Sequence, residues 1–234
     1  MSVANGLKND QTQTAVTLIG CGFVADLYMR SLQASRIAVL GVFALNQPRL
    51  TAFCDHWGVP RFASLDALLA AQPHDGVVLN LTNPSAHYEI NRACLMAGHH
   101  VYSEKPLALD MDHVRELHGL AAERGVLLAS APCSVLGEAA QTLAKAVRDG
   151  VAGTPRLIYA ELDDGFIPQA PVRDWNSESG APWPYEDEFQ VGCTLEHAGY
   201  YLTWLIAMFG TVRSVTAASA GVIPDKLGVA EAAP

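Results

Sequence analysis

The sequence predicts an α/β fold, in which a doubly wound parallel sheet is followed by an incomplete α+β domain with an open, mostly antiparallel sheet. Up to about residue 130, short apolar runs alternate with longer amphipathic stretches. The runs are apolar almost throughout, as strands that are covered on both faces must be. After about residue 150 the order changes to strand, long loop, helix and strand. We therefore expect a disordered tail over 1–13, a first domain over 14–132 and a second over 133–234.

The elements of the first domain follow from this alternation. The apolar runs predict strands over residues 16–19, 37–43, 76–81, 100–102 and 126–128. The amphipathic stretches predict helices over residues 23–33, 48–57, 65–71, 85–97 and 111–124. Strands and helices that alternate in this way favour right-handed βαβ units and a parallel sheet with helices on both faces.

The second domain has fewer and less regular elements. We expect a helix over 134–148, which Gly150 would end, and another over 193–209, which Gly210 would end. Residues 156–162 and 212–218 are expected to be strands, and the segment 165–187 to be a long loop. This loop carries Arg173, Trp175, Trp183 and Tyr185, which suit contact with a sugar or equally packing within the domain.

Composition excludes several classes of function. The formal net charge of −9 and the absence of a basic run argue against a nucleic-acid partner. The longest apolar stretch, 198–209, is too short to span a membrane, which takes about 20 residues. The number of cysteines is odd and their spacings are wide, so we expect free thiols in a reducing, cytoplasmic compartment. They are Cys21, Cys54, Cys94, Cys133 and Cys193.

A glycine-rich turn stands between the first expected strand and helix. Its residues are Gly20-Cys21-Gly22-Phe23-Val24-Ala25, which read as G-x-G-x-x-A. In the Rossmann-type fold Gly20 would allow the tight turn, Gly22 the approach of a diphosphate and Ala25 the close packing of helix on strand. Backbone N–H groups at the helix start, including those of Phe23 and Val24, would face the anion. The alternative is an ordinary glycine turn; we predict NAD or NADP binding.

The end of the second expected strand leaves the choice of dinucleotide open. An NAD site usually carries an acidic residue about 20 residues after the glycines, and residues 42–49 contain none. Asn46 could bond a ribose hydroxyl and Arg49 could meet a 2′-phosphate. Both residues could equally serve only the loop itself.

Two further segments carry a resemblance to a known family. The first contains Thr82-Asn83-Pro84 and, three residues on, His87; the second ends in Glu104-Lys105-Pro106. With the glycine turn, they resemble the family of glucose–fructose oxidoreductase, inositol dehydrogenase and MocA, well over residues 15–135 and less completely to about 220. The resemblance implies that the first segment and Glu104 help to bind the cofactor. It also implies that Lys105 lies beside the nicotinamide and the reacting carbon.

Physical chemistry supports a catalytic Lys105. A lysine at the carboxyl end of a strand faces the crevice where ligands bind in open α/β sheets. Its ammonium can hydrogen-bond a substrate hydroxyl, and burial beside a positive nicotinamide would lower its pKa. Glu104 would hold the local backbone or an ion pair, and Pro106 would fix the turn. The alternative for Lys105 is a solvated lysine at a strand end.

Helix 193–209 resembles the catalytic helix of the family, with substitutions. The family pattern has an aspartate and a histidine four residues apart; His197 and Tyr201 take these places here. We expect Tyr201 to donate or accept the proton and His197 to orient it or bind substrate, while His197 as the acid/base is an open alternative. Another is that Tyr200, Tyr201 and Trp204 are core residues. Cys193 and His197 share helical spacing, but two ligands make no site, and no metal is expected.

The resemblance implies an NAD(P)-dependent oxidoreductase that passes a hydride between nicotinamide and a secondary alcohol or ketone of a sugar, polyol or sugar derivative. Members of the family usually continue further and form dimers through the sheet of the second domain. We therefore expect a homo-oligomer, and a chain ending at Pro234 that is a fragment or a shortened member. The altered His197 and Tyr201 pair leaves an alternative: a catalytically silent NAD(P)-binding regulator or interaction module.

Overall fold

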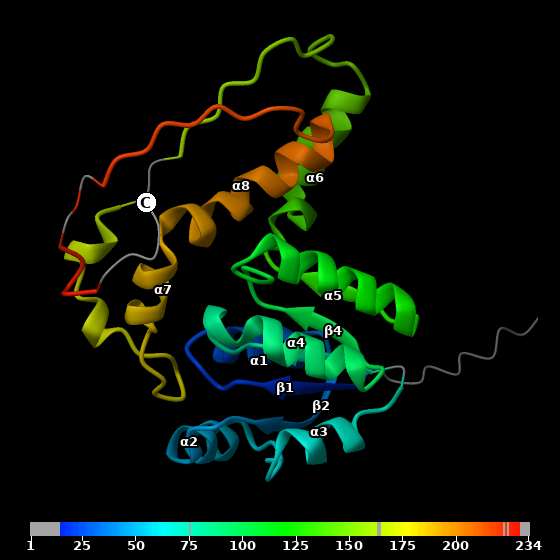
Figure 1. Ribbon diagram of the computed structural model, residues 1–234, viewed down its shortest axis with the longest axis vertical. Helices are drawn as coiled ribbons and strands as arrows, with labels where there is room; N and C mark the ends of the chain where they lie inside the picture. Colours follow the sequence, from blue (N-terminus) through cyan, green and yellow to red (C-terminus); the bar gives the residue numbers. More distant parts are fainter. Residues whose placement is uncertain (1–14, 75, 163–164, 222, 224, 230–234) are drawn as a thin grey trace, which may run out of the picture.

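The first half of the chain forms a single parallel sheet. The computed structural model describes residues 15–74, 76–162, 165–221, 223 and 225–229, so the expected tail over 1–13 lies outside the described residues. Five strands pair in the order β2-β1-β3-β4-β5, and every neighbouring pair is parallel (Figure 1). The strands are β1 (Ala15–Ile19), β2 (Ala38–Phe43), β3 (Val77–Asn80), β4 (His100–Ser103) and β5 (Leu128–Ser130). The predicted doubly wound sheet is confirmed; the fifth strand begins two residues later than expected.

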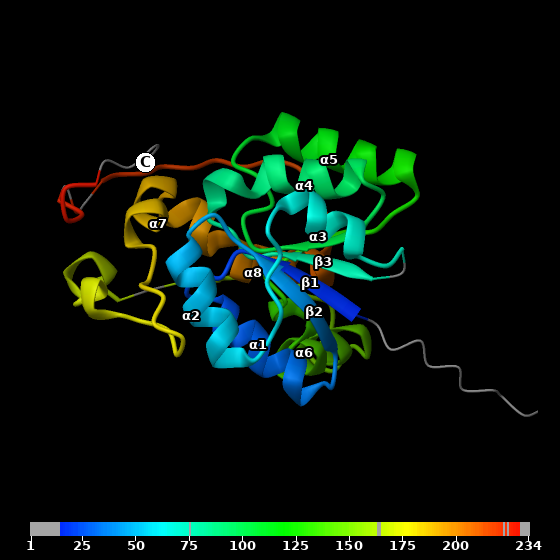
Figure 2. The same ribbon diagram turned by 90° about the horizontal axis from the view of Figure 1, so that it is seen from below.

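Helices cover both faces of this sheet (Figure 2). One face carries α1 (Ala25–Ala34) and α2 (Gln47–Trp57). The other carries α3 (Leu65–Ala71), α4 (His87–Met96) and α5 (Met111–Arg124). Two buried apolar clusters fill the spaces between sheet and helices: Leu18, Met29 and Phe53 belong to the first, and Val78, Leu95 and Leu117 to the second. The near-continuous apolar strands are the cause, since the central strands β1 and β3 bury side chains on both faces.

Local signals set the limits of the helices. The Asn46 side chain accepts a hydrogen bond from the N–H of Arg49 at the start of α2. Ser64 and Asp110 cap α3 and α5 in the same way. Gly58 and Gly125 end α2 and α5 in the left-handed conformation that glycine adopts at little cost. These caps explain why the limits of α3 and α5 equal the predicted ones.

Strand order creates a crevice at one edge of the sheet. β1 connects to β2 on one side, whereas the chain returns to β3 on the other side of β1. Ligands of open α/β sheets bind at such a switch point, beyond the carboxyl ends of the strands. The segments that follow β1, β3 and β4 meet here: Leu81 N–H donates to the Ile19 carbonyl, and Glu104 N–H to that of Asn80.

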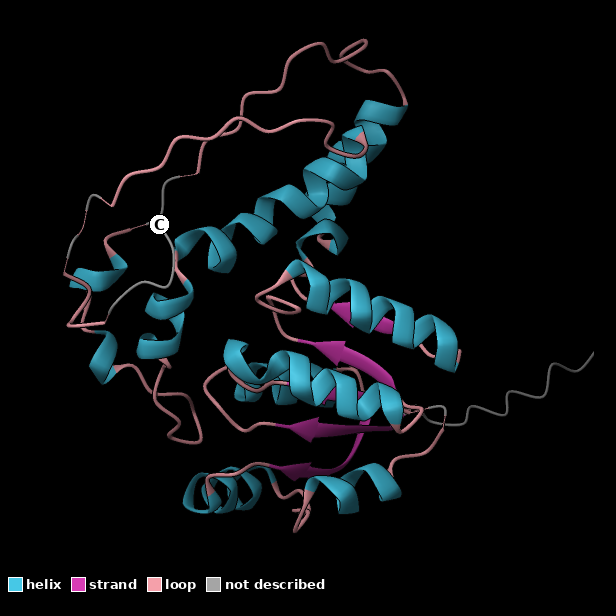
Figure 3. Ribbon diagram, in the orientation of Figure 1, coloured by secondary structure: helices cyan, strands magenta, loops and turns pink. Residues whose placement is uncertain are grey.

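In the described part of the second half, helices are joined by long segments without regular secondary structure (Figure 3). A short 3₁₀ turn, Ser134–Leu136, precedes α6 (Glu138–Arg148), so the helix expected over 134–148 is interrupted at Gly137. Two more 3₁₀ turns, Ile167–Gln169 and Val172–Asp174, lie in the expected loop, and α7 (Tyr185–Val191) begins within its last residues. The long helix α8 (Cys193–Phe209) has the predicted limits.

The predicted sheet of the second domain is wrong for the described residues. Residues 156–162 and 212–218 are exposed and form no ladder there. Their apolar composition suits a strand, but a strand also needs a neighbour for its N–H and C=O groups. The homo-oligomer expected through that sheet therefore stays a prediction, as do the domain limits at 132 and 133.

Within the described ranges, no helix is both long and apolar enough to cross a membrane. All five cysteines are free thiols, as expected.

Candidate active site

A cavity of about 270 Å³ lies at the carboxyl ends of β1, β3 and β4, where α7 and α8 close over the crevice. The switch point of the sheet thus carries an actual cavity, and residues from both halves of the chain line it. Its lining comprises Gly22, Phe23, Val24, Leu27, Leu81, Thr82, Asn83, Pro84, Glu104, Lys105, Trp183, Pro184, Glu188, His197 and Tyr200.

The two glycines of the first turn have different roles. Gly20 has a φ of +99°, and a Cβ there would lie 2.5 Å from the Leu81 carbonyl oxygen. A Cβ on Gly22 would meet nothing within 4 Å, so the space above this residue is open to the cavity. α1 begins at the fully buried Ala25 without a side-chain cap, and the first N–H groups of a helix have no partner within it. These features fit a dinucleotide diphosphate.

The segment after β3 is held by a buried amide. Asn80 is fully buried, and its Oδ1 accepts hydrogen bonds from the Thr82 hydroxyl at 2.7 Å and the Thr82 N–H at 3.2 Å. Its Nδ2 donates to Oδ1 of Asn91 at 2.8 Å. Asn83 contacts Asp187 of α7 through its side chain. Thr82 and Asn83 are therefore fixed along the wall of the cavity.

His87 supports this wall from behind and does not line the cavity. Its ring is fully buried. Nδ1 lies 2.6 Å from the Pro106 carbonyl oxygen, and Nε2 lies 2.8 Å from that of Thr82. The ring thus connects the segments after β3 and β4.

The segment after β4 presents Lys105. Glu104 Oε2 accepts a hydrogen bond from the Lys105 N–H at 3.0 Å, and its Oε1 accepts one from the Tyr28 hydroxyl at 2.6 Å. Glu104 thus holds the local backbone and a tyrosine of α1. The Lys105–Pro106 peptide bond is cis.

The Lys105 ammonium lies against two carboxylates from the second half of the chain. It contacts Glu196 of α8 directly, and Oε2 of Glu188 on α7 is 3.6 Å away. The Tyr200 ring centroid is 5.8 Å from Nζ. Burial favours the neutral amine, but the charge of Glu188 and the hydrogen bond to Glu196 outweigh it and raise the pKa of Lys105. The expected lowering of this pKa is wrong for the described residues, because two carboxylates from α7 and α8 face the ammonium.

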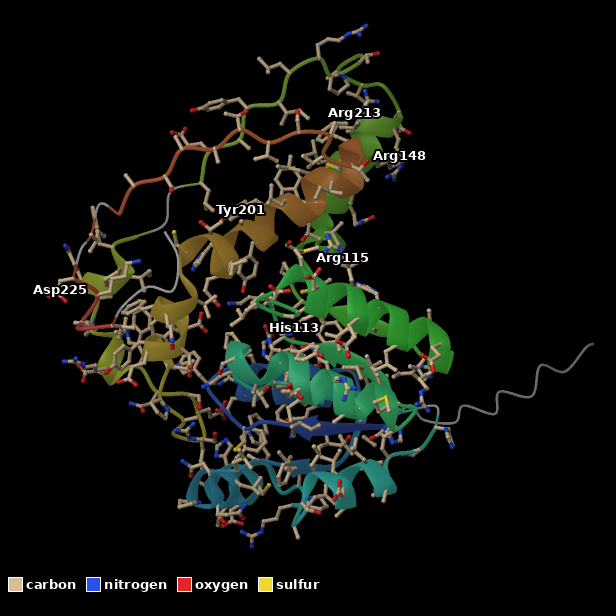
Figure 4. All side chains as sticks on the ribbon, viewed as in Figure 1. His113, Arg115, Arg148, Tyr201, Arg213 and Asp225 are labelled. Atoms are coloured by element: carbon tan, nitrogen blue, oxygen red, sulfur yellow. The ribbon has the colours of Figure 1, made fainter. Side chains whose placement is uncertain are left out.

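The residues of α8 that face Lys105 are not the predicted pair of His197 and Tyr201. Glu196 and Tyr200, four residues apart, lie at the lysine, and His197 lines the cavity beside them. Tyr201 does not line the cavity; it is exposed, on the side of α8 turned away from the strands (Figure 4). The geometry therefore does not support Tyr201 as proton donor. Tyr200 and Tyr201 are not core residues either, since both are exposed.

The residues expected to choose between NAD and NADP lie outside the cavity lining. Asn46 is exposed, and its side-chain oxygen caps α2. Arg49 is half-buried, and its charge acts on the Cys21 thiol in the glycine turn. Its contact with a 2′-phosphate stays a prediction.

A loop from the second half of the chain is hydrogen-bonded to the first turn of α1, directly after the glycine-rich turn. Asp26, buried in the first turn of α1, accepts hydrogen bonds from the Ser179 N–H at 3.0 Å, the Ser179 hydroxyl at 2.9 Å and Trp57 Nε1. Burial opposes ionisation, but hydrogen bonds from Ser177, Ser179 and Trp57 outweigh it and lower the pKa of Asp26. Further along the loop, Trp183 packs against Trp175 and Phe189. This packing brings Trp183 into the cavity wall.

Sequence reasoning missed Glu188, Glu196 and Asp26. A signal was present for Glu196, since it is an acid in an otherwise apolar helix, and an ionisable residue in such a position needs a partner. A comparable signal marks Asp26, which stands between Ala25 and Leu27 in an apolar segment. None marks Glu188, which stands among polar and charged neighbours.

A second cavity, of about 500 Å³, adjoins the first. The two share Trp183, Glu188 and His197 in their walls. The remaining wall is mostly apolar and comes from α7, α8 and the segments around Ile167 and Ile223. Among the described residues, no cluster of histidine, cysteine and acidic side chains could hold a metal ion.

Comparison with known proteins agrees with this architecture. The family model described as "Oxidoreductase family, NAD-binding Rossmann fold", which joins glucose–fructose oxidoreductase, inositol dehydrogenase and MocA, matches residues 14–131. The chain belongs to this family. Its first half is therefore an NAD(P)-binding Rossmann domain.

Two of the similar curated proteins are dehydrogenases. The chain is 29% identical over 168 residues to mouse trans-1,2-dihydrobenzene-1,2-diol dehydrogenase. The aligned region covers 70% of this chain and 50% of the relative. It is 31% identical over 154 residues to UDP-N-acetylglucosamine 3-dehydrogenase of Acidithiobacillus ferrooxidans, over 65% of this chain and 46% of the relative. The chain thus spans about half the length of the curated relatives it matches.

Similar solved structures contain either dinucleotide. Biliverdin reductase from Synechocystis, in complex with biliverdin and NADP+, has a TM-score of 0.64 at 26% identity and covers 87% of this chain and 60% of its own. GenD2 from gentamicin A biosynthesis, in complex with NAD, has a TM-score of 0.54 at 27% identity, over 60% and 40% of the two chains.

Proposed function

We propose that this chain is the cofactor-binding and catalytic part of an NAD(P)-dependent oxidoreductase. It would act on a secondary alcohol or ketone of a sugar, polyol, diol or sugar derivative. The observation that carries the proposal is the position of the Lys105 ammonium, which lines the same cavity as the open turn at Gly22. The names of the two curated relatives, which are dehydrogenases of a diol and of a nucleotide sugar, support the substrate class.

The residues of the cavity would divide the work. The N–H groups at Gly22, Phe23 and Val24 would hold the diphosphate. When bound, the nicotinamide ring supplies the acceptor or donor of the hydride. Lys105 would hydrogen-bond the substrate oxygen and fix the carbinol carbon at the ring, and Trp183 would exclude water from that side.

The contact of α8 with Lys105 supports roles for His197 and Tyr200 at the substrate. Both line the cavity, and their rings are 6.2 Å apart. We propose that His197 binds substrate and that Tyr200, rather than Tyr201, stands next to the reacting oxygen. The five free thiols support a reducing, cytoplasmic setting.

Replacement of Lys105 tests this function. A spectrophotometric scan of polyols, sugars and cyclic diols with NAD+ and NADP+ should find turnover in the wild-type chain. In Lys105→Ala we expect kcat/KM to fall by about 100-fold or more, because misplacement of the reacting groups costs about that much. The dissociation constant of the dinucleotide should change little.

Lys145→Ala is the matched control, because Lys145 is an exposed lysine on α6 that pairs with Asp149 on the surface. Undiminished turnover of Lys105→Ala would reject the assignment. Dinucleotide binding without turnover on any tested alcohol or ketone would instead indicate the regulatory alternative.

A further inference from the structure

Three ionisable groups meet where α7 and α8 close over the sheet. The Lys105 side chain is 17% exposed, that of Glu188 19% and that of Glu196 2%. The ammonium touches Glu196 and lies 3.6 Å from Oε2 of Glu188, so both carboxyl groups face the same ammonium. Two acids and one base thus share a small and largely buried space.

The charges of this cluster do not balance when all three groups are ionised. Two carboxylates and one ammonium leave a net negative charge, and an uncompensated buried charge is costly. Oε1 of Glu196 is buried and has no hydrogen-bond partner among the described residues. One proton held between the carboxyl groups would remove the excess charge and supply the missing hydrogen bond.

The electrostatics of Glu188 agree with a shared proton. Burial is the main cause that raises the pKa of Glu188 to about 8, and the neighbouring Glu196 carboxyl group adds to it, while the charge of Lys105 acts against both. Two carboxyl groups that interact strongly titrate as a pair, so the proton belongs to both. The other ionisable groups in the two adjoining cavity walls are Glu104, Cys193, His197, Tyr200 and Lys226.

We propose that Glu188 and Glu196 hold one exchangeable proton between them and pass it through the Lys105 ammonium to or from the substrate oxygen. This inference rests on the proposed function. It makes the two glutamates positioning and relay residues that act through Lys105.

Protons and electrons balance in both directions of the proposed reaction. In oxidation the substrate C–H bond breaks, its electron pair leaves as hydride to the nicotinamide, and the O–H electron pair forms the carbonyl bond. The hydroxyl proton moves to Lys105 while the ammonium gives one of its own protons to the deprotonated glutamate pair. Lys105 remains charged and the pair gains one proton; in reduction every step runs in reverse. Oxidation therefore needs the pair without its proton, and reduction needs it with the proton.

A direct titration tests the proposal without turnover. In the full chain labelled with ¹³C at the glutamate carboxyl carbons, and without dinucleotide, NMR should find a resonance that titrates with a midpoint near pH 8. This titration should be absent in Glu188→Gln. It should persist in Glu186→Gln, an exposed neighbour on α7, and in His197→Gln, which removes the histidine of the same cavity.

A pH profile then connects the proton to the reaction. In the wild-type chain, kcat for oxidation should rise and kcat for reduction should fall as pH increases through about 8. Glu188→Gln should lose this change of kcat with pH, whereas KM and the dissociation constant of the dinucleotide should change less than about threefold.

The outcomes separate this proposal from the function on which it rests. If every glutamate of the wild-type chain titrates at acidic pH, the shared proton is refuted even where turnover is normal; this result needs no variant to fold. If kcat of Glu188→Gln still changes with pH through about 8 as in the wild-type chain, the relay is refuted. Absence of dinucleotide binding would reject the proposed function, while the NMR titration would still report on the pair.

Discussion

At the residue scale, Gly20 and Gly22 stand two positions apart in one turn and have separable tasks. Gly20 combines a φ of +99° with a close approach to the segment after β3. Gly22 has open space in front of its Cα. The glycine pattern of the sequence therefore combines a requirement of folding with a requirement of ligand binding.

Gly20→Ala should destabilise the protein. The left-handed backbone alone costs a residue with a Cβ about 1–3 kcal/mol, and the new methyl group would lie 2.5 Å from the Leu81 carbonyl oxygen. We expect a fall of several degrees in Tm by differential scanning calorimetry. Gly22→Ala is the control and should leave Tm unchanged; equal losses in the two variants would contradict the separation of tasks.

The candidate site was predictable where a residue follows a strand, and less so where two distant helices meet. Strand ends gather at one edge of a parallel sheet, so the sequence alone places Gly22, Thr82, Asn83, Glu104 and Lys105 together. The partner of Lys105 depends on which side of α8 faces the sheet. A helix permits several such sides, and packing of α7 and α8 selects the one with Glu196 and Tyr200.

At the element scale, the loop around Ser179 is attached to α1 through Asp26. The carboxylate accepts two hydrogen bonds from Ser179 and one from Trp57 of α2. Nearby, Glu178 of the loop pairs with Arg30 of α1. The loop leads into Trp183 and Pro184 of the cavity wall, so its attachment positions that wall.

Asp26→Ala should loosen this attachment. Removing the acceptor leaves half-buried donors of Ser179 and Trp57 without this partner, at a cost of about 1 kcal/mol. Limited proteolysis should then cut the loop between residues 175 and 183 faster than in the wild-type chain. Asp55→Ala, at an exposed acid on α2, serves as control; an unchanged cleavage rate for Asp26→Ala would show that the loop is held by other contacts.

Elements with their own caps and periodicity were predicted well, and elements that depend on a partner were not. α3, α5 and α8 have the predicted limits, because amphipathic spacing and end signals lie within each segment. Residues 156–162 and 212–218 look like strands by composition alone. They form no ladder among the described residues, since pairing requires an edge that composition does not specify.

At the scale of the whole molecule, Glu188 should make stability depend on pH. Its pKa is raised from 4.5 to about 8 in the folded protein, so the folded state binds more protons than the unfolded state in this range. Stability therefore falls as pH rises through this window. Asp26 and Lys105 do not oppose this trend, because the lowered pKa of Asp26 acts at acidic pH and the raised pKa of Lys105 acts above pH 10.5.

Thermal denaturation at pH 7 to 9, above the range in which the lowered pKa of His99 acts, should report this dependence. We expect the Tm of the wild-type chain to decrease toward pH 9, and that of Glu188→Gln to decrease less, because the amide cannot ionise. Glu186→Gln should follow the wild-type curve. Parallel curves for Glu188→Gln and the wild-type chain would indicate that Glu188 is ionised in the folded protein at neutral pH.

Binding of a dinucleotide to the turn after β1 is the claim on which site and function both depend. Isothermal titration calorimetry of the purified chain with NAD+ and NADP+ tests it most directly, with Gly22→Val as the variant that fills the open space. We predict saturable binding of at least one dinucleotide to the wild-type chain and at least a tenfold weaker affinity for Gly22→Val at unchanged Tm. A folded wild-type chain that binds neither dinucleotide, in oxidised or reduced form, would contradict the account.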